Sequence, residues 1–205
     1  MTLRHPRSLG VLFVTTFLAA THLGSVSAGA ETTAMKTGAL TSQPIGHFEF
    51  CKRYPKECTV RTDEDRPERM SEQFQARLIA LTVAVNRAVK PMSDAALYGQ
   101  DEFWTYPDNA GDCEEYVLEK RRTLIAEGRS AGNLLITVVR KPDGEGHAVL
   151  TVRTNVGDLI LDNLNDAVKI WYETPYNYIK RQAAFDAGRW VTIRENHAPR
   201  VGSVE

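Results

Sequence analysis

The chain has 205 residues, of which 42% are hydrophobic, and a formal net charge of -1 from 25 basic and 26 acidic side chains. This balance, without any polybasic run, excludes the electrostatic signature of a nucleic-acid-binding or membrane-surface protein. The length allows one sizeable core rather than two. We therefore expect a single domain that acts on protein or peptide partners.

The first residues have the pattern of an export signal. Arg4 and Arg7 precede a mostly apolar run over 9–23, and small residues follow at 25–28, which is the order of a secretory signal peptide. Threonines and a histidine interrupt the run, which is shorter than the roughly 20 apolar residues of a membrane-spanning helix. We expect residues 1–28 to be removed, and the mature protein to be periplasmic or secreted without membrane insertion.

The three cysteines divide into a pair and a single residue. Cys51 and Cys58 enclose a short polar loop containing Pro55, and in an exported protein this favours a disulfide between them. Two reduced cysteines are the alternative, and a zinc site is a weaker one because structural zinc requires four ligands. A Cys51–Cys58 disulfide leaves Cys113 as a free thiol.

After the predicted signal peptide, the sequence predicts a leader and then a long helix. Residues 29–43 are mostly small and polar, which predicts a flexible leader, and order is expected from about Pro44, where the single domain 44–205 begins. Between Arg66 and Lys90, apolar residues recur at steps of three and four, with Pro67 in the first turn and Pro91 after the end. These apolar residues form one stripe, which predicts a scaffold helix. The stripe consists of Met70, Phe74, Leu78, Leu81, Val85 and Val89.

A second helix follows an aromatic loop. Residues 101–111 mix aromatic residues with turn formers and predict an irregular segment. Residues 113–127 then place acids in the first turn and basic residues towards the end, in the sense that the helix dipole favours, and Gly128 suits the C-terminal cap.

The remaining pattern is that of antiparallel strands. Residues 134–139, 147–154 and 159–162 are rich in β-branched residues and are separated by turn sequences at 141–146 and 155–158. A late strand is expected over 190–193. Helices followed by a meander predict the α+β class, with helices packed on an antiparallel sheet.

Cys113 begins the second predicted helix, where unsatisfied backbone N–H groups and the helix dipole favour a thiolate. The neighbouring acids Asp112, Glu114 and Glu115 disfavour a second anion, so a cation or a protonated His147 is needed beside them. The same residues are also typical of an ordinary helix start, since Asp112 is a common N-cap.

His147 and Asp162 complete a candidate triad with Cys113. Adjacent antiparallel strands can bring His147 and Asp162 side by side, and a carboxylate of this kind fixes the tautomer of a catalytic imidazole. His47 and His197 are alternative bases if this pairing does not form.

These motifs, in this order, resemble the bacterial transglutaminase-like cysteine peptidases, members of the papain-like superfamily that include the LapG-type periplasmic proteases. The resemblance covers about residues 44–195. It rests on Gly46-His47 with Phe50-Cys51 and Cys58, then Gly111-Asp112-Cys113-Glu114-Glu115-Tyr116, Gly146-His147-Ala148-Val149-Leu150 and Leu161-Asp162-Asn163.

The resemblance implies a papain/transglutaminase-like fold and amide hydrolysis through a thioester. Cys113 is then the nucleophile, His147 the base and later the acid, and Asp162 the orienting carboxylate. The Cys113 backbone N–H is the expected oxyanion donor. Trp104 is expected to line the cleft, and Gln100 is a candidate for the oxyanion side chain by chain position alone.

LapG-type members also bind calcium beside the active-site cysteine, and Asp112 and Glu114 match those positions, whereas Glu115 stands where the family commonly has Asp. Ca²⁺ would offset the acids beside the thiol; no organic cofactor is implied. The substrate is a protein or peptide, with a cell-surface protein as one candidate. Two alternatives remain: transglutamination, if an amine replaces water as acceptor, and a non-catalytic secreted binding module.

Overall fold

The computed structural model describes residues 1–2, 33–63 and 66–194. Most of the predicted signal peptide, the start of the leader and the tail that contains His197 lie outside the described residues. In the described part of the chain, none of the helices has both the length and the apolar character needed to cross a membrane.

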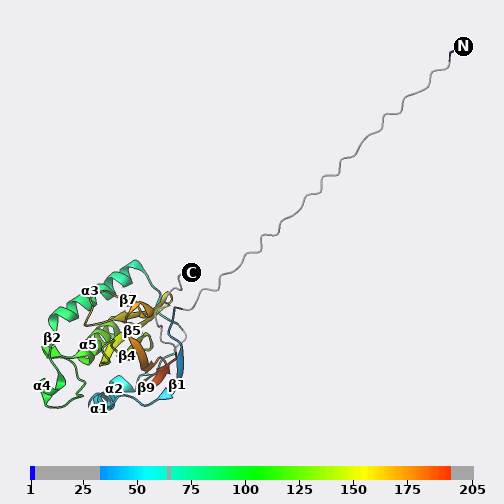
Figure 1. The fold of residues 1–205 in the computed structure, drawn as a ribbon. Coiled ribbons are helices and arrows are strands. Elements are labelled where there is room, and N and C mark those ends of the chain that lie inside the picture. Colours follow the sequence, from blue (N-terminus) through cyan, green and yellow to red (C-terminus); the bar gives the residue numbers. More distant parts are fainter. Residues whose placement is uncertain (3–32, 64–65, 195–205) are drawn as a thin grey trace. The chain divides into compact units, whose positions relative to one another are not determined.

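A seven-stranded sheet forms the centre of the domain (Figure 1), in the order β1-β9-β8-β4-β5-β6-β7, and all neighbouring strands run antiparallel. The strands are β1 (Thr37–Thr41), β4 (Leu134–Arg140), β5 (Gly146–Thr154), β6 (Gly157–Leu161), β7 (Lys169–Ile170), β8 (Asn177–Ala183) and β9 (Asp186–Ile193).

Helices pack against the sheet, with α5 in contact with β4 and β5 and α3 packed against α5 (Figure 1). The helices are α1 (Ile45–Arg53), α2 (Pro55–Cys58), α3 (Glu72–Ala88), α4 (Asp94–Tyr98) and α5 (Cys113–Ala126), with short 3₁₀ turns η1 (Ala131–Asn133) and η2 (Trp171–Glu173). Two further short strands, β2 (Lys90–Pro91) and β3 (Ala110–Gly111), pair in parallel before α5.

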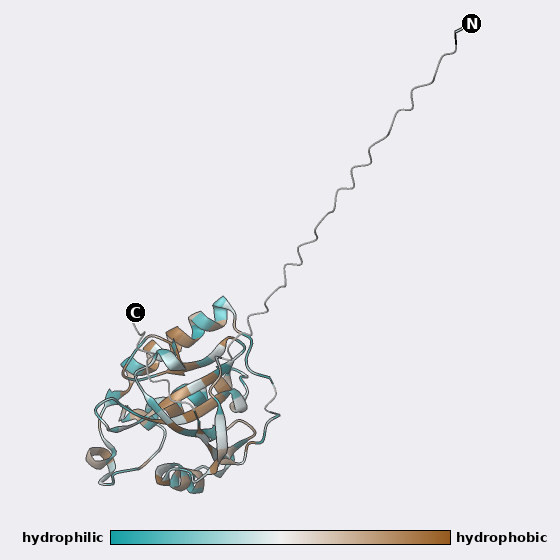
Figure 2. Cartoon of the chain, turned by 45° about the vertical axis from the view of Figure 1, so that its right-hand side comes forward, coloured by the Kyte–Doolittle hydropathy of each residue, from teal (hydrophilic) through white to brown (hydrophobic). Residues whose placement is uncertain are grey.

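The sheet separates two apolar clusters because side chains alternate along each strand. On β5, Ala148, Leu150 and Val152 join the larger cluster with the helices, whereas Val149 joins the smaller cluster with Trp171. Apolar residues accordingly concentrate in the central strands, while the connecting loops are mostly hydrophilic (Figure 2). Both faces of the sheet are therefore covered.

The structure confirms the predicted α+β class, with helices packed on an antiparallel sheet, and the meander of β4, β5 and β6. It also confirms the second helix: α5 ends at Ala126, and Gly128 follows with a φ of +88°, a left-handed conformation that glycine adopts without a Cβ penalty.

Two boundaries differ from the sequence prediction. The long helix begins at Glu72 rather than near Pro67, because the Ser71 side chain accepts a hydrogen bond from the Phe74 N–H and caps the first turn there. Residues 37–41, inside the predicted flexible leader, form β1 and pair with β9. The sheet therefore begins before Pro44, where the sequence suggested that order starts.

Candidate active site

Cys113 is the first residue of α5, and its backbone is held by the turn that precedes the helix. The Asp112 N–H donates to Glu115 Oε2 at 2.9 Å, an N-terminal capping contact. A Cβ at Gly111 would lie 2.5 Å from the Glu115 side chain, so this position requires glycine. The sequence Gly-Asp-Cys-Glu-Glu thus places the thiol at the helix start.

Cys113 and His147 line one cleft of about 610 Å³. Side chains from separate parts of the chain form its walls: Pro44, Ile45, Glu102, Trp104, Asp112, Glu114, Val138, Gly146 and Lys180. The Ala148 backbone N–H, next to His147, acts to lower the pKa of the Cys113 thiol. The helix start and the beginning of β5 therefore meet at the thiol.

His147 and Asp162 are hydrogen-bonded, as the sequence predicts for adjacent antiparallel strands. His147 Nε2 lies 2.9 Å from Asp162 Oδ1, and both side chains are buried. Burial raises the pKa of Asp162, but hydrogen bonds from His147, Tyr176 and the Leu164 N–H outweigh it, and the net direction is downwards. An ionised Asp162 orients the Nε2–H tautomer, which leaves Nδ1 able to accept a proton.

His47, the alternative base within the described residues, lies in the core and not at the cleft. It accepts a hydrogen bond from Trp190 Nε1 at Nδ1, 3.2 Å away, and its Nε2 is 3.8 Å from Cys58 Sγ. Burial lowers the pKa of His47 to about 3, with the Arg121 charge acting in the same direction. The imidazole is therefore a neutral packing group.

Cys51 and Cys58 form a disulfide, as their spacing predicts. The bridge joins α1 to α2 and packs against His47. Since His47 also contacts Trp104, which lines the cleft, the disulfide supports one wall of the cleft from behind.

The thiol environment differs from the one that the helix dipole alone suggests. Burial raises the pKa of Cys113 well above its ordinary value, and Glu114 raises it further through its charge and as acceptor of the thiol hydrogen, at 2.9 Å; the Ala148 N–H opposes this shift. Thiolate is disfavoured here because burial, and then the acid beside the sulfur, oppose the effect expected of the helix N-terminus.

Carboxylates crowd the helix start and suit an oxygen-coordinated cation. Ligand atoms of Asp94, Asp112 and Glu115 lie within 4.8 Å of one another, and so do those of Asp112, Cys113 and Glu114. Asp94 Oδ1 and Asp112 Oδ1 are buried, and neither has a hydrogen-bond partner among the described residues. Burial and then Asp112 raise the pKa of Glu115 to about 8, although the Thr105 N–H opposes this. Unpaired buried carboxylate oxygens fit Ca²⁺.

Asp94 was not anticipated from the sequence. It begins α4 after the N-cap Ser93, accepts the Phe103 N–H at Oδ2 and lies 98% inside the protein. Its sequence context is that of an ordinary helix start, so only the packing of α4 against the start of α5 indicates a role.

Trp104 lies in the cleft as expected, whereas Gln100 does not. Trp104 is buried and donates from Nε1 to Glu102 Oε2 at 3.0 Å. Gln100 is exposed after α4 and is not among the described residues that line the cleft. The suggestion that Gln100 supplies an oxyanion side chain has no support in this geometry.

A sequence profile described as bacterial transglutaminase-like cysteine proteinase matches residues 37–198, which is most of the chain. The chain belongs to this family. It is a cysteine peptidase of the transglutaminase-like type. No curated protein sequence matches it.

Solved structures of Legionella pneumophila LapG resemble this cysteine proteinase. The calcium-bound form has a TM-score of 0.51 at 23% identity and covers 63% of this chain and 75% of its own. The EGTA-treated form has a TM-score of 0.50 at 24% identity and covers 60% and 70%. At this identity, the likeness shows the shared fold.

Proposed function

We propose that this cysteine proteinase is exported and hydrolyses a peptide bond of a protein substrate through Cys113, His147 and Asp162. The observation that supports this most directly is the meeting of Cys113 and His147 in one cleft, with His147 Nε2 held 2.9 Å from Asp162 Oδ1. The signal-like N-terminus supports a periplasmic or secreted location, where a cell-surface protein is accessible as substrate.

The proposed reaction has two halves. His147 Nδ1 takes the Cys113 proton, Sγ attacks the carbonyl carbon, and the Cys113 backbone N–H, which lacks an intrahelical acceptor, binds the oxyanion. Collapse breaks the C–N bond, His147 returns the proton to the leaving amine, and a thioester remains. Water then attacks the thioester as His147 takes its proton, and the acid and free thiol are released.

Calcium dependence forms part of the proposal. Asp112 and Glu114 would hold Ca²⁺, with Asp94 beside Asp112 as a further candidate, because Asp94 and Asp112 carry buried oxygens for which the described residues offer no partner. Bound Ca²⁺ supplies positive charge that offsets the acids beside the thiol. With its charge offset in this way, Glu114 would accept the thiol hydrogen less strongly, and Cys113 could give its proton to His147.

Alkylation of Cys113 by iodoacetamide at neutral pH tests the proposal, read by peptide mass spectrometry with calcium present or chelated. We expect rapid modification with calcium, slower modification with chelator, and slow modification of His147→Ala in both. Equal rates in the parent and His147→Ala would contradict the triad, and equal rates with and without calcium would contradict the calcium dependence.

A second assay separates hydrolysis from acyl transfer. Casein is incubated with the protein and a labelled primary amine, with Cys113→Ala as the control. New casein fragments without label indicate hydrolysis, whereas labelled intact casein indicates transglutamination, since the same thioester then reacts with the amine.

A further inference from the structure

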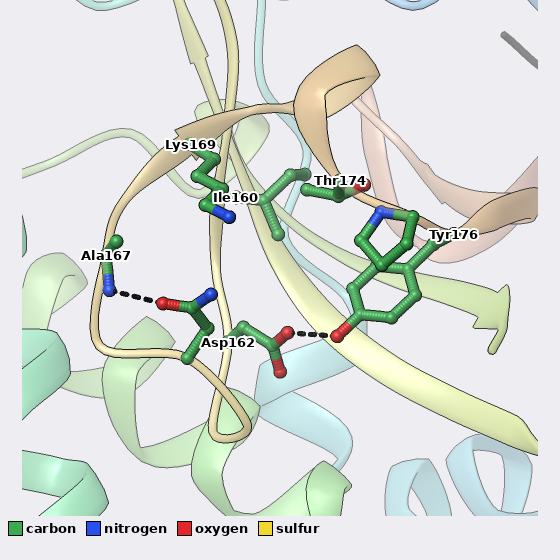
Figure 3. A pocket seen from close by; sticks show the side chains of 8 residues that line it. Ile160, Asp162, Ala167, Lys169, Thr174 and Tyr176 are labelled. Atoms are coloured by element: carbon green, nitrogen blue, oxygen red, sulfur yellow. Dashed lines mark hydrogen bonds between the residues drawn. The ribbon is translucent and has the colours of Figure 1, made fainter. Parts of the chain in front are cut away.

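Tyr176 lies at the end of the Asp162 side chain, on the segment between η2 and β8. Its hydroxyl donates to Asp162 Oδ2 at 2.5 Å, and Figure 3 shows this contact closing one side of the carboxylate. The ring of Tyr176 also faces the His147 ring, with 5.5 Å between centroids and 59° between planes. One side chain therefore contacts both members of the His147–Asp162 pair.

The two oxygens of Asp162 have different partners. Oδ1 accepts from His147 Nε2 and from the Leu164 N–H at 3.0 Å. For Oδ2, Tyr176 is the partner found within the described part of the chain. The backbone is held separately, because Asn86 Nδ2 donates to the Asp162 carbonyl at 2.9 Å. Rotation of the carboxylate is thus restrained at Oδ2 by Tyr176.

The Tyr176 ring is anchored by packing and, together with Asp162, lines a small cavity. It is half-buried and packs against the smaller apolar cluster that contains Trp171 and Tyr178. A cavity of about 20 Å³ beside Asp162, lined by Ile160 and Thr174 among others, has room for about one water molecule. The ring limits solvent access to the His147–Asp162 hydrogen bond from this side.

We infer that Tyr176 is a positioning residue that holds the Asp162 carboxylate against His147 and shields their hydrogen bond from water. This inference rests on the proposed triad. Tyr176 contacts neither Cys113 nor the substrate in this assignment, and it acts only through Asp162 and His147. The chemistry that it serves is proton transfer at His147 Nδ1, which requires a fixed ring orientation.

Tyr176→Phe tests the inference because it keeps the ring and removes the donor. General-base assistance contributes on the order of 10²–10⁴ in rate, so a looser imidazole should forfeit a part of it, about tenfold. We expect iodoacetamide to modify Cys113 about tenfold more slowly at neutral pH with calcium present. Tyr54→Phe is the matched control, since it also removes a partly buried hydroxyl contact, to Thr105 at 3.2 Å, away from the triad.

Proton NMR supplies a second measurement, whose result would not change if Tyr176 had only a structural role. The imidazole N–H shared with Asp162 should give a protected downfield signal, assigned by its loss in His147→Ala. In Tyr176→Phe this signal should broaden through faster exchange with water, whereas in Tyr54→Phe it should persist.

The outcomes distinguish the inference from the function on which it rests. Unchanged alkylation and an unchanged N–H signal in Tyr176→Phe, with slow alkylation in His147→Ala, would overturn the role of Tyr176 and leave the triad intact. Parent-like alkylation in His147→Ala would overturn the triad and the inference together. Equal losses in Tyr176→Phe and Tyr54→Phe would also overturn the inference, because they indicate a general packing effect.

Discussion

At the level of single residues, the start of α5 combines two opposing effects on one thiol. The helix N-terminus favours an anion, but Glu114 accepts the thiol hydrogen at 2.9 Å and disfavours one. The same glutamate is a proposed calcium ligand. Cys113 is therefore expected to stay protonated until a cation binds the Glu114 carboxylate and offsets its charge.

Glu114→Gln should uncouple Cys113 from calcium. Removing one negative charge beside a buried thiol lowers the pKa of that thiol, so alkylation in chelator should rise, about tenfold at neutral pH. The response to added calcium should shrink at the same time. Glu119→Gln, on the same helix and beside Arg122, is the control. Parent-like alkylation of Glu114→Gln in chelator would argue against this account.

Lys120 is a second residue whose environment opposes its charge. It is fully buried in α5, and its Nζ has no hydrogen-bond partner within 33–63 or 66–194. Burial lowers its pKa to about 8 against the opposing charges of Asp162 and Asp166. The unfolded chain, with an ordinary lysine pKa of about 10.4, binds more protons between pH 8 and that value. The destabilisation is therefore complete below pH 8 and disappears as the pH rises through this window.

Lys120→Met should consequently stabilise the protein at pH 7 by up to about 3 kcal/mol, since each unit of pKa shift corresponds to about 1.4 kcal/mol. The gain over the parent should fall towards zero near pH 10.5. Urea unfolding of both proteins from pH 7 to 10.5 measures this difference in the free energy of unfolding. A gain that does not change across this range would show that packing, rather than charge, is responsible.

At the level of elements, the disulfide links α1 and α2 behind the cleft wall. Cys51 and Cys58 are seven residues apart, and closing such a short loop restricts the unfolded chain by about 2 to 3 kcal/mol. Cys51→Ser/Cys58→Ser should lower the free energy of unfolding by about that amount. Cys113 alkylation should stay near the parent rate well below the melting temperature, because the proposed triad lies on α5, on β5 and directly after β6.

Thermal unfolding and alkylation of the double variant, compared with the parent protein under non-reducing conditions, separate the two effects. A large loss of Cys113 reactivity at a temperature where the variant is folded would mean that the disulfide also positions the cleft.

Elements with local signals were predictable, and those that depend on long-range pairing were not. The capping residues and Gly128 define α5 within the chain, and the turns define β4 to β6. β8 was missed because buried Arg181 and Gln182 interrupt its apolar pattern; their partners, Asp158 and the Ile136 N–H, lie far away in sequence. In a sequence, buried polar side chains of this kind resemble surface residues until their partners are known.

The candidate site shows the same division. The order Cys113, His147, Asp162 could be read from motifs, and the structure brings His147 to Asp162 in the register that antiparallel strands allow. Asp94 and Tyr176 carried no signal, because each joins the site through contacts with residues distant in the chain: Asp94 with Asp112, and Tyr176 with Asp162 and His147. The effect of Glu114 on the thiol also needed the actual distance, since a helix start alone predicts the opposite sign.

At the level of the whole molecule, Asp158 connects three separate parts of the described domain. Its Oδ2 accepts from the Met35 N–H at 2.9 Å, before β1, and from Arg181 Nη1 at 2.8 Å, on β8, while Asp158 itself belongs to β6. Both charged side chains are more than nine-tenths buried. This pair therefore ties the segment before β1 to strands on either side of β4 and β5.

Asp158→Asn should destabilise the fold by about 3 to 5 kcal/mol, because it leaves the Arg181 charge buried without its counterion. Asp158→Asn/Arg181→Met should recover much of this loss, since the double variant removes both charges and retains similar volume. Chemical unfolding of the parent, the single variant and the double variant measures the effect. If the double variant were no more stable than Asp158→Asn, the unpaired guanidinium would not be the cause of the loss.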